Sequence, residues 1–139
     1  MHATPSSLTV SENGLGRYQQ TVSAGRHTLI ADEPLAMDGD DAGLAPFDFL
    51  LAALGSCTSI TLRMYAQRKN LALTHVSVAL SHQKIEVEGL GRVDRIERII
   101  TLEGDLNFEQ RQRLLEIANR CPMYRTLQSD LKIDSRIAE

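Results

Sequence analysis

The first third of the chain alternates between apolar and polar residues in short runs, a pattern typical of β-strands. Strands are predicted over residues 17–22 and 27–31, joined by a hairpin turn at Ser23-Ala24-Gly25-Arg26. Residues 8–10 are a candidate for a short edge strand. Acidic residues, glycines and a proline follow over 32–45, which predicts a surface loop.

The segment from Pro46 to Asn70 has the strongest helical pattern in the chain. Pro46 suits the first position of a helix, and Asp48 suits the positive end of the helix dipole. Residues 49–54 are apolar nearly all round, which is typical of a helix buried on most sides. We therefore expect this segment to be the central helix of the fold.

Two longer strands are expected after this helix. The alternation that begins at Val76 shifts its phase before Ile85, which predicts a bulge or a bend near Gln83. A turn is predicted over 88–91, followed by a strand whose apolar residues alternate over 96–102.

The last part of the chain has helical periodicity over 107–120, where the first residue and Gln110 have capping-box spacing. A short helix is expected over 123–127 and a last strand over 131–135. This order of elements is typical of an α+β fold with a mostly antiparallel sheet, in a single domain covering residues 1–139.

Composition narrows the function classes. A chain of 139 residues with 42% hydrophobic and 24% charged residues is an ordinary soluble globular domain. The net charge of -3 argues against a nucleic-acid partner. Residues 49–62 carry no charge but are too short for the ~20 residues of a membrane span, and the first residues lack a signal-peptide pattern. We therefore expect a cytoplasmic protein whose two cysteines are free or redox-active.

The two cysteines are the main candidates for chemistry. Cys57 has apolar helical neighbours such as Leu54 and Ile60, so its alternative role is that of an unreactive core cysteine with a raised pKa. Cys121 precedes Pro122 and is predicted to cap the short helix, where free N–H groups can lower a thiol pKa. Its alternative role is a small cap residue chosen for packing.

The two thiols could form a disulfide if the fold brings them together, although they are 64 positions apart. That spacing does not match a CxxC metal cluster, and the histidines lack paired spacing. We therefore expect no metal site.

Two segments resemble the OsmC/Ohr family of hydroperoxide-reducing proteins. APFDFLLAALGSCTSITLRMYAQRKN is similar to the central cysteine helix of that family. DRIERIITLEGDL, followed by NFEQRQRLLEIANRCPMYRTLQ, is similar to its second cysteine region. The likeness covers nearly the whole chain, and ADEP, LLAALGSC and CPMYRTL resemble the OsmC-like branch. The resemblance implies an intertwined homodimer in which antiparallel sheets wrap two long cysteine helices and both subunits contribute to each active site.

The resemblance also implies a thiol peroxidase that needs no cofactor. Cys57 would attack an organic hydroperoxide and become a sulfenic acid, and Cys121 would then form a disulfide with it. An external dithiol would reduce the pair. An apolar pocket for the substrate would be lined by Phe47, Leu50, Leu54 and Met64.

In the family, an arginine from the first hairpin stabilises the thiolate. Arg26, at the predicted turn, is the first candidate, and Arg17 is the second; the alternative for either is a solvated surface charge. The family's glutamate that orients this arginine is replaced here by Phe47, with Asp48 next to it. The arginine would then be held differently, or Cys57 would be less activated.

Three functional hypotheses follow from these residues. The first is a cytoplasmic, homodimeric peroxidase of organic hydroperoxides. The second is a non-enzymatic module that binds an apolar ligand or senses redox state, which Phe47 at the glutamate position favours. The third is acyl transfer through a Cys57 thioester, for which no histidine or asparagine is placed as a base.

Overall fold

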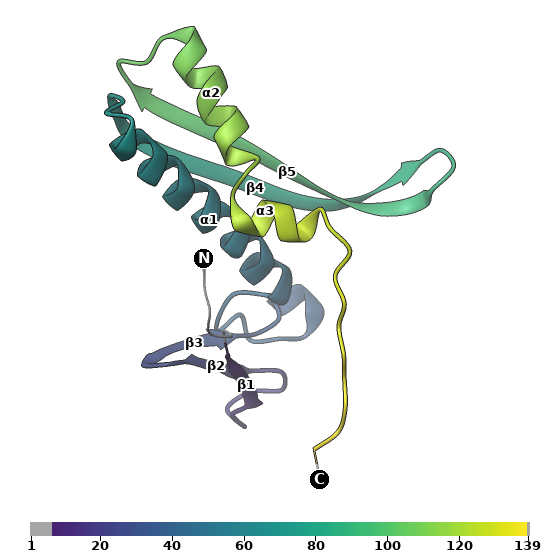
Figure 1. The fold of residues 1–139 in the computed structure, drawn as a ribbon. Helices are drawn as coiled ribbons and strands as arrows, with labels where there is room; N and C mark the ends of the chain where they lie inside the picture. Colours follow the sequence, from purple (N-terminus) through teal and green to yellow (C-terminus); the bar gives the residue numbers. More distant parts are fainter. Residues whose placement is uncertain (1–6, 139) are drawn as a thin grey trace. The chain divides into compact units, whose positions relative to one another are not determined.

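A computed structural model describes residues 7–138 of the chain (Figure 1). Contacts divide the chain into two compact units, Met1–Leu50 and Leu51–Glu139. The first unit contains three strands, a single 3-10 turn at Leu35–Met37 and the start of the long helix α1. The second contains the rest of α1, a long hairpin and two further helices.

The first unit is built on a three-stranded antiparallel sheet in the order β1-β2-β3. The strands are β1 (Thr9–Glu12), β2 (Gln20–Ala24) and β3 (His27–Ala31). The predicted hairpin is confirmed, and its turn contains Gly25 at a φ of +59°, a conformation that glycine adopts without steric cost. The strand expected over 17–22 begins later, at the first residue of β2.

The loop over 32–45 is organised around one buried carboxylate. Asp32 is only 3% exposed and accepts hydrogen bonds from the backbone N–H groups of Glu33, Asp40 and Ala42, at 2.8, 3.3 and 3.1 Å. These bonds, led by the one from Ala42, lower the pKa of Asp32. One side chain therefore stabilises several turns of a segment that has little regular structure.

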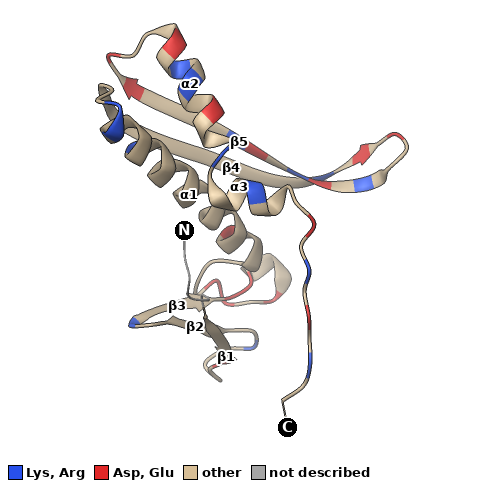
Figure 2. Cartoon of the chain, in the orientation of Figure 1, with Lys and Arg blue, Asp and Glu red and all other residues tan. Residues whose placement is uncertain are grey.

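Helix α1 covers Pro46–Arg68, as predicted. Its first turn is capped by Asp48, whose carboxylate accepts the backbone N–H of Ala45 at 3.2 Å, and Asn70 ends the helical region with a φ of +57°. No charged residue occurs in its middle (Figure 2). By length and composition alone, α1 is the one helix among residues 7–138 that could cross a membrane.

The core of the second unit explains the apolar character of α1. Leu62, Tyr65 and Ala66 of α1 are buried in one cluster with residues of the second helix and the hairpin. Gly55 lies so close to the hairpin that a Cβ there would be 2.7 Å from Cδ1 of Leu80. One face of α1 is therefore packed in the core of this unit, while Ile60 and Met64 stay exposed.

The long hairpin consists of β4 (Leu73–Val87) and β5 (Gly91–Gly104), paired antiparallel. Of the bulge or bend predicted near Gln83, the bulge is wrong, because the pairing is regular from His75 to Val87 and is irregular only between Leu73 and His75.

The phase shift in the sequence has another cause. Along both strands every second residue is half-buried, and this alternation shifts by one residue at the same place in each strand, between the pair His82 and Ile96 and the pair Ile85 and Val93. The hairpin therefore twists so that its opposite face becomes the half-buried one, without an inserted residue. Figure 1 shows the two strands crossing.

Two helices follow the hairpin. Helix α2 (Phe108–Ala118) begins with the predicted capping box of Asn107 and Gln110. Helix α3 (Pro122–Leu127) follows after a short turn.

The predicted strand over 131–135 is wrong. Within the described residues no strand follows α3, and Leu131 and Ile133 are 58% and 82% exposed. The alternation is present in the sequence, but a strand also needs a neighbouring backbone for its hydrogen bonds, and the described part of the chain offers it none.

Candidate active site

The fold of the second unit brings the two cysteines into contact. Cys57 lies near the middle of α1, and Cys121 is the N-cap residue of α3. The two thiols are free and lie close enough for Cys121 to shift the pKa of Cys57. Cys57 is half-buried, whereas Cys121 is fully buried. The pair is therefore a reduced dithiol with one sulfur that solvent can reach and one that it cannot.

The position of Cys121 follows from the local sequence. Pro122 occupies the first position of α3, where a missing N–H has no cost, and Cys121 takes an extended backbone conformation before it. The sulfur of Cys121 accepts the backbone N–H of Tyr124 at 3.3 Å. It also lies 3.9 Å from the hydroxyl oxygen of Thr58 on α1.

The environment of Cys57 favours the protonated thiol. Burial raises the pKa of Cys57, and the neighbouring thiol of Cys121 raises it further. Hydrogen bonds from the backbone of Met123 and the side chain of Thr61 act in the opposite direction and lower it, but the net shift is upward. The contacts within this unit thus hold Cys57 in the form that is less nucleophilic.

A cation lies next to the dithiol, and the sequence analysis did not identify it. Arg98, on β5, donates hydrogen bonds to the hydroxyl of Thr58 at 3.0 Å, to the carbonyl of Ala118 at 3.2 Å and to the side chain of Asn119 at 2.6 Å. Its guanidinium lies 4.8 Å from the centre of the Tyr124 ring. Arg98 therefore links β5 to α1, to the end of α2 and to α3.

The sequence did contain a signal for Arg98. Ile96, Arg98 and Ile100 alternate along β5, so the arginine falls in the apolar phase of a strand that is half-buried at these three positions. A charged residue in such a phase requires hydrogen-bonding partners in the interior.

The predicted arginines belong to the first unit. Arg26 is exposed in the β2–β3 turn, and Arg17 lies in the loop before β2, with its guanidinium 5.9 Å from the centre of the Tyr18 ring. Their place beside Cys57 stays a prediction.

The predicted substrate residues all lie on α1. Leu50, Leu54 and Met64 have the helical spacing that puts them on the same stripe as Cys57. Leu54 is buried, whereas Met64 and Phe47 are 59% and 50% exposed. Their role in substrate binding also stays a prediction.

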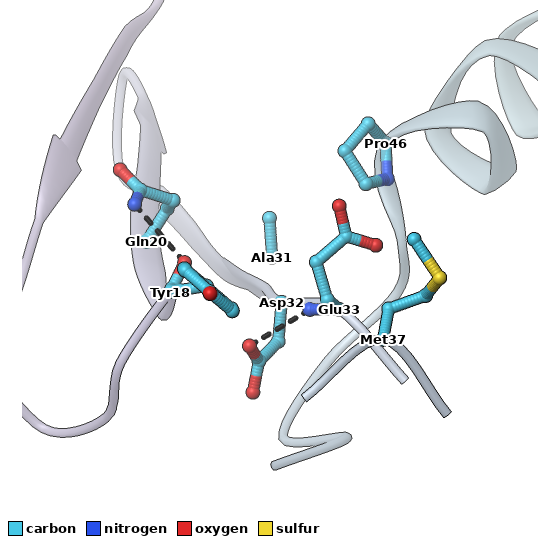
Figure 3. Close-up of a pocket in the computed structure, with 7 residues that line it drawn as sticks. All are labelled: Tyr18, Gln20, Ala31, Asp32, Glu33, Met37 and Pro46. Atoms are coloured by element: carbon cyan, nitrogen blue, oxygen red, sulfur yellow. Dashed lines mark hydrogen bonds between the residues drawn. The ribbon is translucent and has the colours of Figure 1, made fainter. Parts of the chain in front are cut away.

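A cavity of about 430 Å³ lies in the first unit, and the residues around it include Tyr18, Glu33 and Met37 (Figure 3). Asp32 also borders it, but the carboxylate of Asp32 is engaged by backbone N–H groups of its own loop. The Asp32 carboxylate therefore serves the structure of its own loop. Across residues 7–138, no three His, Cys, Asp or Glu side chains are grouped as metal ligands.

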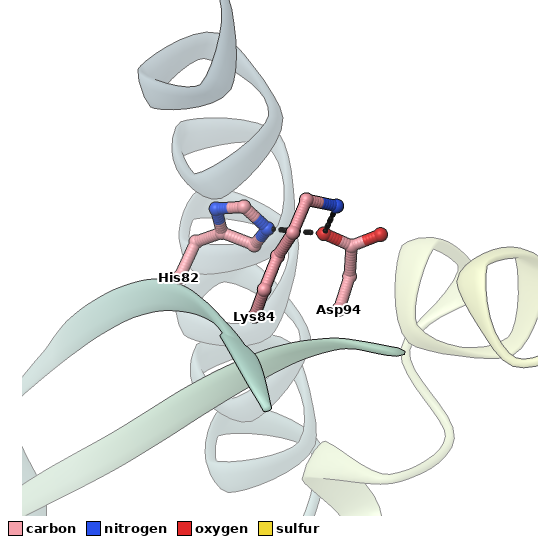
Figure 4. A network of polar contacts seen from close by, with 3 residues as sticks. All are labelled: His82, Lys84 and Asp94. Atoms are coloured by element: carbon pink, nitrogen blue, oxygen red, sulfur yellow. Dashed lines mark hydrogen bonds and ion pairs between the residues drawn. The ribbon is translucent and has the colours of Figure 1, made fainter. Parts of the chain in front are cut away.

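A polar network occupies the hairpin where its covered face changes (Figure 4). One carboxylate oxygen of Asp94 lies 2.7 Å from Nζ of Lys84 and 2.8 Å from Nε2 of His82. These contacts, the Lys84 bond first, lower the pKa of Asp94. The network joins the two strands across the ladder, so its contacts are those of a structural crosslink.

The comparisons with known proteins agree with this architecture. A family model described as OsmC-like protein matches residues 39–136. No curated protein sequence matches the chain. Among solved structures, an OsmC-like protein from Mycoplasma pneumoniae has a TM-score of 0.76 at 17% identity, covering 91% of this chain and 89% of its own.

Two further structures are named for hydroperoxide resistance. An organic hydroperoxide resistance protein from Legionella pneumophila has a TM-score of 0.69 at 17% identity, with 92% of each chain covered. The organic hydroperoxide resistance protein OhrB of Bacillus subtilis has a TM-score of 0.64 at 18% identity, covering 93% of this chain and 94% of its own. At such identities the likeness shows a shared fold.

Proposed function

The chain belongs to the OsmC-like protein family, and we propose that it reduces organic hydroperoxides through Cys57 and Cys121. The family resemblance and the α+β class with antiparallel sheets and a long helix, both predicted from the sequence, are confirmed. The observation that carries the proposed activity is the pair of neighbouring free thiols, which differ in burial.

This difference in burial supports an order in which the two thiols react. Cys57 is the one that a dissolved hydroperoxide can reach, because Cys121 is fully buried. The thiolate of Cys57 attacks the outer oxygen of the hydroperoxide and breaks the O–O bond. Cys57 becomes a sulfenic acid, and the other oxygen leaves as an alcohol after taking up a proton.

The second step closes the disulfide. The sulfur of Cys121 attacks the sulfur of the Cys57 sulfenic acid, an S–S bond forms, and the hydroxyl leaves with the Cys121 proton as water. The closeness of the two thiols supports this step, because a disulfide requires the two sulfurs to come within bonding distance. An external dithiol then reduces the disulfide and restores both thiols.

The first step needs a thiolate, and the contacts of Cys57 within its own unit oppose one. The N–H of Met123 and the hydroxyl of Thr61 provide part of the compensation. We assign the rest to a guanidinium of the first hairpin, Arg26 or, second, Arg17. With Phe47 in place of the family's glutamate, that guanidinium is held without the usual carboxylate.

The apolar stripe of α1 favours organic hydroperoxides over hydrogen peroxide. Leu50 and Leu54 precede Cys57 at helical spacing, Met64 follows it, and Phe47 begins the helix. Apolar side chains in these places gain from covering an alkyl or acyl group, whereas hydrogen peroxide offers no such surface. We propose these side chains as the wall of the substrate site.

We further propose that the protein is a cytoplasmic homodimer. Ile60 and Met64, on α1, are 55% and 59% exposed, and Ile99 on β5 is 55% exposed. The alternating tail contains Leu131 and Ile133, which have no pairing strand within the described residues. A second copy of the chain is the occupant that would cover the apolar face of α1 and pair with the tail.

The experiment measures consumption of cumene hydroperoxide by the purified protein, with dithiothreitol and dihydrolipoamide as separate reductants. We expect turnover by the wild type, none by Cys57→Ser, and slower turnover by Cys121→Ser, in which no intramolecular disulfide forms for the dithiol to reduce. Ser59→Ala is the matched control on the same helix and should retain activity. A wild type that leaves the hydroperoxide intact with both dithiols would contradict the proposal.

A second candidate function is a module that binds an apolar ligand without turnover, or that senses redox state. The raised pKa of Cys57 favours it, because a protonated thiol is a poor nucleophile. Native mass spectrometry of the purified protein separates the two: a stoichiometric apolar ligand together with thiols inert to hydroperoxide would support binding.

A further inference from the structure

The hydroxyl group of Thr58 has a fully assigned set of hydrogen bonds. Its single proton is donated to the carbonyl of Leu54, one turn earlier in α1, at 2.7 Å. Its oxygen accepts an N–H of Arg98 at 3.0 Å. Since the proton is already used, the contact of 3.9 Å with the sulfur of Cys121 has the thiol as the donor.

This assignment fixes the orientation of the Cys121 thiol. Its S–H points to Thr58, and its sulfur accepts the N–H of Tyr124. With its proton committed to Thr58, the Cys121 sulfur has a lone pair left for the neighbouring thiol of Cys57, the arrangement needed to attack a sulfenic acid there.

Arg98 contacts residues next to each of the two cysteines. On one side it binds Thr58, the residue next to Cys57. On the other it binds Ala118 and Asn119, which precede Cys121, and lies over the ring of Tyr124, which follows it. All of these contacts go to residues within three positions of one of the two cysteines.

A second arginine shows what a purely structural role looks like in the same unit. Arg111, on α2, donates to the backbone carbonyls of Leu102, Gly104 and Leu106 and ties the helix to the end of β5. It has no contact with Thr58 or with either cysteine among its hydrogen bonds. Arg98 differs from Arg111 because one of its hydrogen-bond acceptors, the hydroxyl of Thr58, also accepts the S–H of Cys121.

We propose that Arg98 and Thr58 are positioning residues for disulfide formation, which direct the lone pair of Cys121 at Cys57. This inference rests on the proposed function and deepens it: neither residue attacks the hydroperoxide, and both act after Cys57 has been oxidised. In that step the sulfur of Cys121 bonds to the sulfur of Cys57, the S–O bond breaks, and the hydroxyl leaves with the Cys121 proton as water.

The test separates the two chemical steps in single turnovers. Cumene hydroperoxide is mixed with the reduced wild type, Arg98→Ala, Arg98→Lys, Thr58→Val and Thr58→Ser. Loss of hydroperoxide reports the first step. The disulfide, the dimedone adduct of the sulfenic acid and the sulfinic acid are measured by mass spectrometry and report the second.

We expect Thr58→Val and Arg98→Ala to form the disulfide roughly ten- to a hundredfold more slowly, as small misplacements of reacting groups do. The dimedone adduct and sulfinic acid should increase, while hydroperoxide loss stays within about twofold of the wild type. Thr58→Ser keeps the hydroxyl and should restore the wild-type rate. Arg98→Lys should restore it only in part, since a lysine cannot bind three acceptors in one plane.

Two controls keep the result interpretable. Arg95→Ala removes an exposed arginine of the same strand, and Arg111→Ala removes the structural arginine; both should leave the ratio of disulfide to dimedone adduct unchanged. Thermal unfolding of every variant identifies those that fail to fold. If Arg98→Ala is unfolded, Thr58→Val, which nearly conserves the side-chain volume, carries the test.

An oxidant other than hydroperoxide distinguishes failure of this inference from failure of the proposed function. Diamide takes two electrons and two protons from the dithiol and leaves a disulfide and a hydrazine, with no peroxidase activity required. If the wild type forms the disulfide with diamide but ignores hydroperoxides, the proposed function is wrong, and the diamide rates of the variants still test the positioning. Folded Thr58→Val and Arg98→Ala proteins that form the disulfide at the wild-type rate would overturn it.

Discussion

The hydroxyl oxygen of Thr58 lies 3.9 Å from the sulfur of Cys121, although the two residues are 63 positions apart in the chain. This contact joins α1 to the start of α3 next to Cys57, so the environment of each thiol depends on the packing of both helices. Changes to one cysteine should therefore be measurable at the other.

The first prediction concerns the pH at which Cys57 reacts. Because burial and the Cys121 thiol raise the pKa of Cys57, its alkylation by iodoacetamide should have an inflection above the pH of an ordinary free thiol. Cys121→Ala removes the contribution of the second thiol and should move the inflection to lower pH, while burial keeps it above the ordinary value. Peptide mass spectrometry measures the rate at Cys57 alone.

Thr61 provides a control for this prediction, because its hydrogen bond lowers the pKa of Cys57. Thr61→Val should move the inflection to higher pH. An inflection of the wild type below that of a free thiol would contradict this prediction and would mean that a cation outside the contacts of this unit outweighs burial and the second thiol.

The second prediction concerns the loop around Asp32. Asp32→Asn replaces one accepting oxygen by an amide nitrogen, so at least one backbone N–H loses its partner and the melting temperature should fall. Since the pKa of Asp32 is lowered in the folded protein, its stabilising effect is complete above the pKa of the unfolded chain. That stabilising effect is lost as the pH falls through the pKa that Asp32 has in the folded protein.

The difference in melting temperature between the wild type and Asp32→Asn should therefore shrink with acidification and disappear below the folded pKa. Asp38→Asn, an exposed acidic residue of the same loop, is the matched control. A difference that is constant with pH would show that the carboxylate's charge is not what stabilises the loop.

The third prediction concerns two glycines that share a positive φ but differ in their surroundings. At Gly104, with a φ of +137°, a Cβ would clash with the carbonyl oxygen of Ala72, whereas at Gly89, with a φ of +85°, nothing lies within 4 Å. Gly104→Ala should lower the free energy of unfolding by about 3 kcal/mol or more, because strain and a backbone clash add. Gly89→Ala should lower it by only about 1 kcal/mol.

Urea denaturation of the two variants measures this difference. Comparing Gly89→Ala with Gly104→Ala separates two contributions to the loss of stability. One is the unfavourable backbone conformation, and the other is the close approach between the end of β5 and the turn after α1. Equal losses at both positions would mean that the turn moves to accept a methyl group.

Local chemistry made the elements of this fold predictable, and long-range contacts account for what was missed. The capping box of Asn107 and the cap formed by Cys121 each depend on a few consecutive residues, so the sequence was sufficient. The contact of Arg98 with Thr58 depends on the register of β5 against α1, which no local pattern contains. The missing strand over 131–135 shows the same limit, because its apolar alternation does not specify a partner.

The last prediction concerns this unpartnered apolar surface. If a second copy covers the exposed face of α1, a charge at Ile60 should be buried without compensation and the dimer should dissociate. Ile60→Lys should give a monomer in size-exclusion chromatography with light scattering, where the wild type gives a dimer. Phe108→Lys places the same charge on a residue that is 75% exposed at the start of α2 and should remain dimeric. A monomeric wild type at micromolar concentration, or an unaltered mass for Ile60→Lys, would contradict the proposed homodimer.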